Sequence, residues 1–341
     1  MFSPKPFIDS LGPVGPWALL GLFIASSFLL IWRLEHMTET GVEGTVLGTL
    51  VMPYCSGISN LIFVFVVYGH GQPATEVVTN CLVNNVTNMT LMIGLPAVIW
   101  GLSLVPRPEP RGGKKKRKKR RKTEDTQGHR INRLSLLLTL TAVLFFTGGA
   151  WALGRDGKLN FGDGLVLVGL FLFWQCFHVF DVLKSNVRQN KSLSWTLLVD
   201  FALLLAGGYG TYLSISGLVD WISSIHTGFI SAKYLGLLSG CLMVVPNALL
   251  ALYYGWKGNP EVVYTSQVGD GHICIPLCLG IYALMTDVPV PKYFETGVFI
   301  LVGATLVHFL FVAVLGRLPR VVGLALLIAY GVFLTLEIRG T

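Results

Sequence analysis

The sequence has little charge for its length. Only 13% of its 341 residues are charged and 52% are hydrophobic, which gives a mean hydropathy of +0.64. Soluble domains carry about 25% charged residues, so the composition excludes an ordinary water-soluble domain. It indicates instead a polytopic protein in a lipid bilayer.

Patterns typical of catalytic and metal sites are also missing. The six cysteines lie within apolar stretches and lack the spacing of a zinc site, which favours a role as small buried side chains. No nucleophile stands with a base in a catalytic arrangement. We therefore expect neither an enzyme nor a cofactor.

Ten apolar segments are long enough to cross a bilayer, which takes about 20 residues. We predict spans at residues 14–33, 43–68, 75–104, 133–153, 162–183, 194–215, 228–254, 261–285, 293–315 and 318–338. Because the spans are apolar helices, an outer-membrane barrel is excluded. An inner or plasma membrane of bacterial type is the expected location.

Basic residues gather in alternate loops, starting with the loop after the first span. The positive-inside rule places these loops in the cytoplasm and both termini on the other side. The densest run, Lys114–Lys122, is either a solvated determinant of topology or a contact for anionic lipid headgroups. No aromatic residue interleaves this run, so we do not expect a nucleic-acid partner.

Two segments, Met52–Gly94 and Met243–Gly280, are apolar stretches interrupted by polar residues. The first holds Ser59, Asn60, Asn80, Asn84, Asn85 and Asn88, and the second holds Pro246, Asn247, Gln267, Asp270 and His272. The same number of positions separates Asn60 from Asn80 and Asn247 from Gln267. Unsatisfied polar groups cost several kcal/mol in hydrocarbon, so this recurrence predicts a polar site where two repeats meet.

The two segments enter the membrane from opposite sides, because five spans separate them. We therefore expect an all-α polytopic membrane protein built as two inverted five-helix repeats. The first half up to the end of its repeat motif covers 1–104, followed by a basic loop at 105–132 and the remaining helices at 133–183. A central loop at 184–193 leads to the second half at 194–341.

The polar segments resemble the alpha-repeats of the sodium/calcium exchanger (cation/calcium antiporter) superfamily. That family carries Gly-Thr-Ser-x-Pro-Glu and then Gly-Asn-x-x-Gly-Ser-Asn-x-x-Asn in each repeat. The matching stretches here are Cys55–Asn60 with Thr79–Asn88, Cys241–Asn247 with Ser266–His272, and a loop pair at Asp156–Leu159 and Asp163-Gly164. The resemblance implies a divergent bacterial-type member that transports cations as an antiporter.

The sequence departs from the family at the cation ligands. The two acidic positions fall on Asn60 and Asn247, and the late amide or acid position falls on Asn88 in one repeat but on Ile275 in the other. Calcium takes 6–8 oxygen ligands, usually with carboxylates among them. Losing both acids therefore disfavours tight calcium binding and makes a monovalent cation easier to hold.

The candidate transport site combines both repeats. Its predicted lining is Ser56, Asn60, Asn84, Asn88, Asn247 and Asp270. An acid deep in a span is a functional candidate by default, and Asp270 with His272 could couple transport to protons. Alternatively, these two side chains satisfy each other, or Asp270 caps a half-helix. His308 also lies within a span, where a role in helix packing is expected.

Two functions remain open from the sequence. One is a secondary cation antiporter with an altered site, exchanging sodium, calcium or protons. The other is a non-transporting membrane scaffold that binds lipid or a partner through its basic loop. The oligomeric state has no signature in the sequence.

Overall fold

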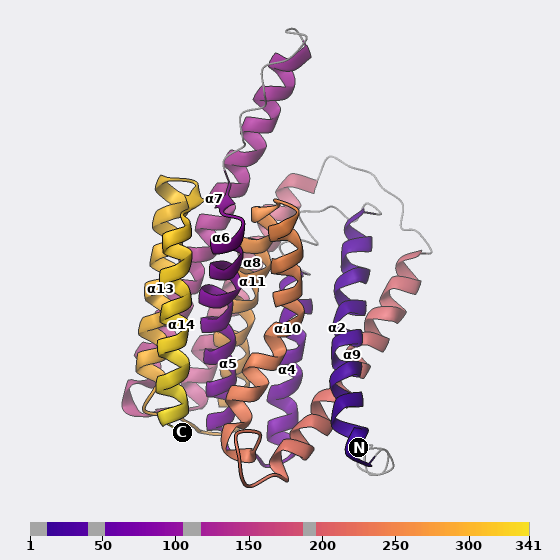
Figure 1. The fold of residues 1–341 in the computed structure, drawn as a ribbon, viewed down its shortest axis with the longest axis vertical. Coiled ribbons are helices and arrows are strands. Elements are labelled where there is room, and N and C mark those ends of the chain that lie inside the picture. The colour runs from indigo at the N-terminus through magenta and orange to yellow at the C-terminus, as the bar shows by residue number, and fades with distance from the viewer. Residues whose placement is uncertain (1–11, 40–51, 105–116, 187–195, 341) are drawn as a thin grey trace.

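The computed structural model describes residues 12–39, 52–104, 117–186 and 196–340 (Figure 1). The first half of the chain contains η1 (Gly12–Val14), α2 (Gly15–Glu39), α4 (Met52–Gly69), α5 (Thr75–Thr87), η3 (Asn88–Met92), α6 (Ile93–Ile99), β1 (Leu102–Ser103), α7 (Arg117–Leu153), η4 (Gly154–Asp156), β2 (Lys158–Leu159) and α8 (Phe161–Asn186). The second half contains α9 (Thr196–Ser223), η5 (Ala232–Tyr234), α10 (Leu235–Trp256), α11 (Pro260–Ile273), η6 (Cys274–Cys278), α12 (Leu279–Met285), β3 (Val288–Pro289), α13 (Phe294–Val314), β4 (Arg317–Leu318) and α14 (Arg320–Gly340).

The all-α polytopic architecture is confirmed, because each predicted span corresponds to a helix of the described chain. The segments α5–η3–α6 and α11–η6–α12 are each one broken helix. Eight of the helices are long and apolar enough to cross a membrane, and α4 and α8 contain shorter apolar stretches at Gly57–Gly69 and Phe161–Phe177. The start of the predicted second span, 43–51, lies outside the described residues.

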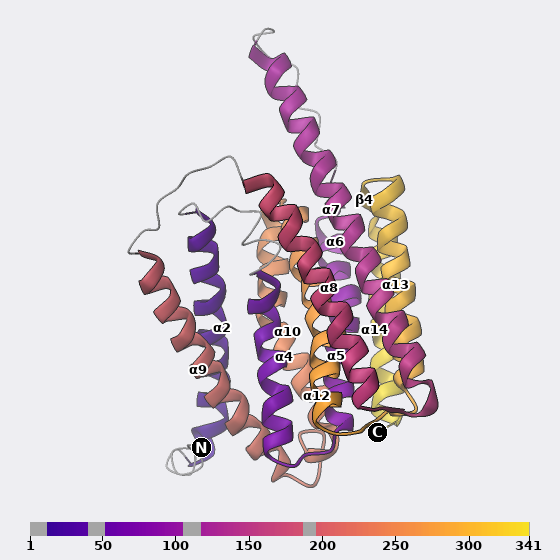
Figure 2. The same cartoon turned by 180° about the vertical axis from the view of Figure 1, so that it is seen from behind.

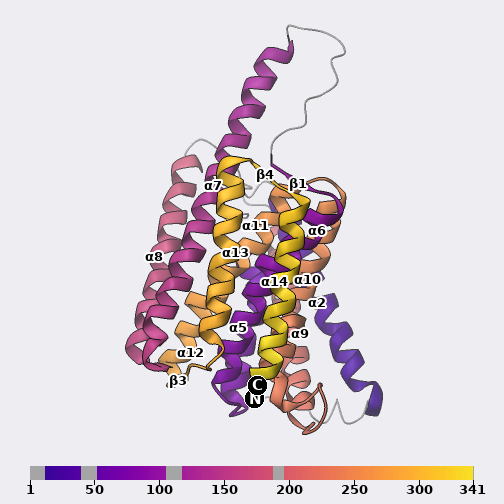
Figure 3. The same ribbon diagram turned by 60° about the vertical axis from the view of Figure 1, so that its left-hand side comes forward.

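The contacts between helices repeat when the two halves are exchanged. Helix α6 packs on α14 and, correspondingly, α12 packs on α8, while α2 packs on α9 and α7 on α13. The short strands follow the same rule, since β1 pairs with β4 and β2 with β3, both antiparallel (Figure 3). The two halves therefore have corresponding helices and strands, and in each case the packing partner comes from the other half or from the corresponding helix pair.

The repeats run in opposite directions. Helix α2 starts at the end of the bundle where α14 finishes, whereas its counterpart α9 starts at the other end (Figures 1 and 2). The amino-terminal part of α7 projects beyond the bundle at the end away from the start of α2. This places the basic part of α7 opposite the start of α2 and the finish of α14, while their sides of the membrane stay a prediction.

Glycines allow the two corresponding crossings to approach closely. A Cβ atom on Gly323 of α14 would lie 2.9 Å from the carbonyl oxygen of Gly94 in α6. A Cβ atom on Gly164 of α8 would lie 2.8 Å from the carbonyl oxygen of Gly280 in α12. Small residues at helix interfaces are the usual means of close packing in membranes.

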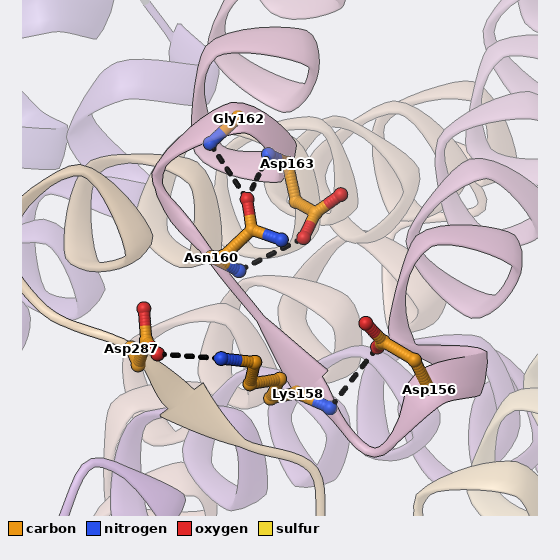
Figure 4. A network of polar contacts seen from close by, with 6 residues as sticks. All are labelled: Asp156, Lys158, Asn160, Gly162, Asp163 and Asp287. Carbon is orange, nitrogen blue, oxygen red and sulfur yellow. Dashed lines mark hydrogen bonds and ion pairs between the residues drawn. The ribbon is translucent and has the colours of Figure 1, made fainter.

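The loop pair at Asp156–Leu159 and Asp163-Gly164 builds a corner before α8 (Figure 4). The Asn160 side-chain oxygen accepts bonds from the backbone N–H groups of Gly162 and Asp163, at 2.8 and 3.3 Å. The Asp163 carboxylate in turn accepts the Asn160 N–H at 2.8 Å. This reciprocal arrangement is a capping box, so the motif shapes the start of α8.

Candidate functional site

The four central helices, α4, α5, α10 and α11, pack against each other across the boundary between the two halves. Helix α5 packs on α10, α11 packs on α4, and the broken regions η3 and η6 contact the opposite repeat. Both broken regions are π segments of five residues, Asn88–Met92 and Cys274–Cys278. Single-turn π segments within α-helices are frequently found at functional sites.

Proline gives each π segment a local cause. Pro276 lies inside η6 and has no N–H to donate. In the first half, Pro96 lies four residues after Met92, so the Met92 carbonyl lacks its α-helical donor. The breaks follow helical stretches of similar length, 13 residues in α5 and 14 in α11, and lie close to the predicted ligands.

Asp270 lies at the centre of the contact between the repeats and is completely buried. The Asn88 amide donates to its Oδ2 atom at 2.8 Å and to Asn84 Oδ1 at 2.8 Å. The Asn247 amide donates to the same Asp270 oxygen at 3.3 Å. One carboxylate oxygen thus receives an amide from each half of the protein.

Several amide oxygens on the central helices have no hydrogen-bond partner. They belong to Asn60, Asn80, Asn85, Asn88, Asn247 and Gln267, all buried. Leaving such an oxygen unsatisfied costs about 1–3 kcal/mol. Two of these oxygens belong to Asn88 and Asn247, whose amides bond to Asp270, and amide oxygens beside a carboxylate suit a hard cation.

Of the predicted lining residues, Asn84, Asn88, Asn247 and Asp270 are brought together by direct hydrogen bonds. Asn60 is buried on α4, which packs on α11 and η6, and neither of its side-chain polar atoms has a hydrogen-bond partner. The Ser56 side chain lies outside the described residues.

His272 does not lie with the other predicted site residues. Its Nε2 atom lies 3.0 Å from the Thr139 carbonyl oxygen on α7, and its ring meets Phe146 and Trp174 edge-on. Positions two apart on a helix point to nearly opposite sides. His272 therefore faces α7 and α8, whereas Asp270 faces η3 and α10, and proton coupling between them stays a prediction.

Gln267 and Cys274 were not among the predicted lining residues. Gln267 donates to the Asn247 backbone oxygen at 3.1 Å, which ties α11 to α10 beside the site. The sequence signal that could have found Gln267 was its separation from Asn247, which equals the separation of Asn80 from Asn60. Cys274 accepts from the Asn84 amide at 3.4 Å.

The described residues contain no group of three or more acidic, histidine or cysteine side chains arranged to hold a metal ion. The central contact is instead one carboxylate among neutral amides and thiols. A cavity of about 700 Å³ lies where α6 and α10 end and α11 begins, lined by Trp100–Leu104 and Gly255–Val262. It lies well away from Asp270 along these helices.

Comparison with known proteins identifies the fold and family. The chain resembles structures of the sodium-calcium exchanger NCX_Mj soaked with 2.5 mM Na⁺ and 10 mM Sr²⁺ (TM-score 0.65, 19% identity, 94% of this chain and 97% of that one). Crystals soaked with 10 mM Na⁺ and zero Ca²⁺ give a TM-score of 0.66 at 18% identity, with 94% and 97% coverage. Those soaked with zero Na⁺ and Ca²⁺ give 0.61 at 19%, with 94% and 96% coverage.

No protein of curated function matches the chain. The family model for the sodium/calcium exchanger protein matches residues 14–180 and 199–339, which is most of the sequence. The resemblance inferred from the polar repeats is thereby confirmed. This chain is an integral membrane protein and belongs to the sodium/calcium exchanger family.

Proposed function

We propose that this protein is a secondary cation antiporter whose central site binds a monovalent cation. The observation that carries the proposal is the Asp270 carboxylate oxygen, which receives an amide from Asn88 of one repeat and from Asn247 of the other. A group held jointly by two inverted repeats can be exposed to either side as the repeats move. That is the requirement for alternating access.

The charge at the site favours a monovalent cation over calcium. Asp270 contributes one negative charge, and the positions where the family carries its acids hold the neutral Asn60 and Asn247. A divalent ion would keep an uncompensated positive charge in a buried environment, which is costly. A monovalent ion paired with one carboxylate leaves the site neutral, and the buried amide oxygens supply further ligands.

The same chemistry provides a route to exchange. Asp270 can bind either a proton or a metal cation, and each neutralises the carboxylate. Two ions that compete for one group bind alternately, so proton–cation or cation–cation antiport follows from the single acid. His272, which contacts α7, would affect this exchange only through the backbone of α11.

The basic segment has a separate proposed role at the membrane surface. We place Lys114–Lys122 and the projecting start of α7 on the cytoplasmic side, with both termini outside, as the loop charges predict. Each basic residue near an anionic surface is worth about 1 kcal/mol. Anionic lipid headgroups are therefore the proposed partner of this segment.

Ion flux in proteoliposomes tests the function. Protein would be reconstituted and challenged with gradients of sodium, protons or calcium, with cation uptake measured in parallel against empty vesicles. We expect sodium or proton flux without calcium uptake. Sodium-driven calcium uptake would overturn the monovalent assignment, and no flux of any ion from folded protein would favour the scaffold alternative.

A further inference from the structure

His308 of α13 contacts both helices that carry the central ligands. Its Nε2 atom lies 2.7 Å from the backbone oxygen of Met89 in η3, and its Nδ1 atom lies 3.4 Å from the hydroxyl of Tyr264 in α11. The side chain is completely buried, and its ring meets that of Tyr264 edge-on at a centroid distance of 5.5 Å. A single residue outside the four central helices thus bridges the two repeats.

The π segment explains why a histidine can bind at Met89. In an α-helix the N–H of Ile93 would donate to the Met89 oxygen four residues earlier. Here the Ile93 N–H donates to Thr90 instead. The Met89 oxygen receives His308, so the broken helix is held by a side chain from α13.

The hydrogen bonds define the state of the imidazole. A backbone carbonyl only accepts, so Nε2 must carry the hydrogen. In the neutral ring Nδ1 is then an acceptor, and the Tyr264 hydroxyl donates to it. His308 consequently links η3 to α11 in a fixed order of donor and acceptor.

We propose that His308 is a positioning residue that sets the separation of Asn88 and Asp270, and thereby the affinity of the cation site. Met89 directly follows Asn88, and Tyr264 precedes Asp270 on the same helix. Fixing the Met89 carbonyl and the Tyr264 hydroxyl therefore fixes the backbones from which these two ligands project. The inference rests on the cation-binding function proposed above.

Variants that separate the bond from the volume test this role. H308F fills the space without a donor, whereas H308Q keeps an N–H at the position of the histidine Nε2 atom, from which it can reach the Met89 oxygen. We expect H308F to raise the KM for sodium in proteoliposomes at least tenfold with kcat little changed, and H308Q to remain within about threefold of the native protein. Y264F, which keeps the bond to Met89, should give an intermediate KM.

A second measurement is independent of transport. Hydrogen exchange of the backbone amides from Leu91 to Gly94, read by mass spectrometry in nanodiscs, should accelerate in H308F but not in H308Q. Accelerated exchange with no flux even from the native protein would retain the bridge and reject the transport function. Equal KM and equal exchange in H308F and H308Q would overturn the positioning role. If H308F failed to fold, an unchanged KM in Y264F together with a raised KM in H308Q would also overturn it.

Discussion

The two halves of the molecule share a backbone plan but differ in chemistry at their centre. Both broken helices have a π segment after a first stretch of similar length, and both halves pair their glycines and short strands in the same way. Yet the first half contributes neutral amides, whereas the second contributes the buried carboxylate of Asp270. Under the proposed function, the fold would fix where the cation ligands stand, and one repeat would supply the charge of the site.

Removing the single charge should break this asymmetry with the largest effect. In D270N both halves would present amides, and a cation would lose its only charged partner in the contact. We expect cation affinity to fall by about 3 kcal/mol, roughly 100-fold. The measurement is sodium-dependent thermal stabilisation of the purified protein in detergent.

A matched acid outside the site controls for general loss of charge. Asp287 is exposed and pairs with Lys158 at 2.9 Å in a loop between α12 and α13. D287N should keep the native response to sodium. If D270N also kept that response, the central contact would be structural and the site would have to lie elsewhere.

Adding charge to both halves should restore the symmetry that the family pattern implies. N60D/N247D places acids at the two positions where the resemblance expects them. We expect calcium to stabilise this variant by about 2.7 kcal/mol at a hundredfold excess over its dissociation constant, with no such effect on the native protein. N160D is the matched control, because Asn160 lies in the corner before α8 and accepts from the backbone of Gly162 and Asp163. Equal calcium responses in both variants would reject the assignment.

The sequence predicted the helices and the repeated polar positions well, because apolar length and helix-breaking residues are local signals. It did not predict which face of α11 each polar residue occupies. Asp270 and His272 stand close in sequence, but the packing of α7 against α11 draws His272 to Thr139, away from the amides. His308 was expected only to pack, since its bond to Met89 depends on a carbonyl that the π segment makes available.

The glycine crossings offer a sharper test of the structural symmetry. The new methyl group of G164A would meet three backbone atoms at 2.8, 2.9 and 3.1 Å, which cannot move aside. That of G323A would meet one backbone atom at 2.9 Å and two side-chain atoms at 3.0 Å. We expect G164A to cost about 1–3 kcal/mol of stability and G323A less, measured as melting temperature in detergent.

Gly303 provides the control for these substitutions, because a Cβ atom there meets nothing within 4 Å. G303A should leave the protein unchanged or slightly more stable, since alanine is the better helix former by about 1 kcal/mol. Equal losses in G164A and G303A would mean that close approach of α8 and α12 does not limit stability.

The smallest expected difference concerns the two strand pairs. The β2–β3 pair is flanked by the exposed ion pair between Lys158 and Asp287, and the hydrogen bond and charge of Asp287 raise the pKa of Lys158 from its ordinary value of 10.5. A raised lysine pKa adds stability that is complete below the ordinary value and disappears as pH rises through the raised one. Exposed pairs contribute little, so K158M should shift the melting temperature at pH 8 by no more than about 1 °C. Both strand pairs also align buried apolar residues, Leu102 with Leu318 in β1–β4 and Leu159 with Val288 in β2–β3. A larger shift in K158M would show that the ion pair, and not these apolar contacts, holds β2 and β3 in register.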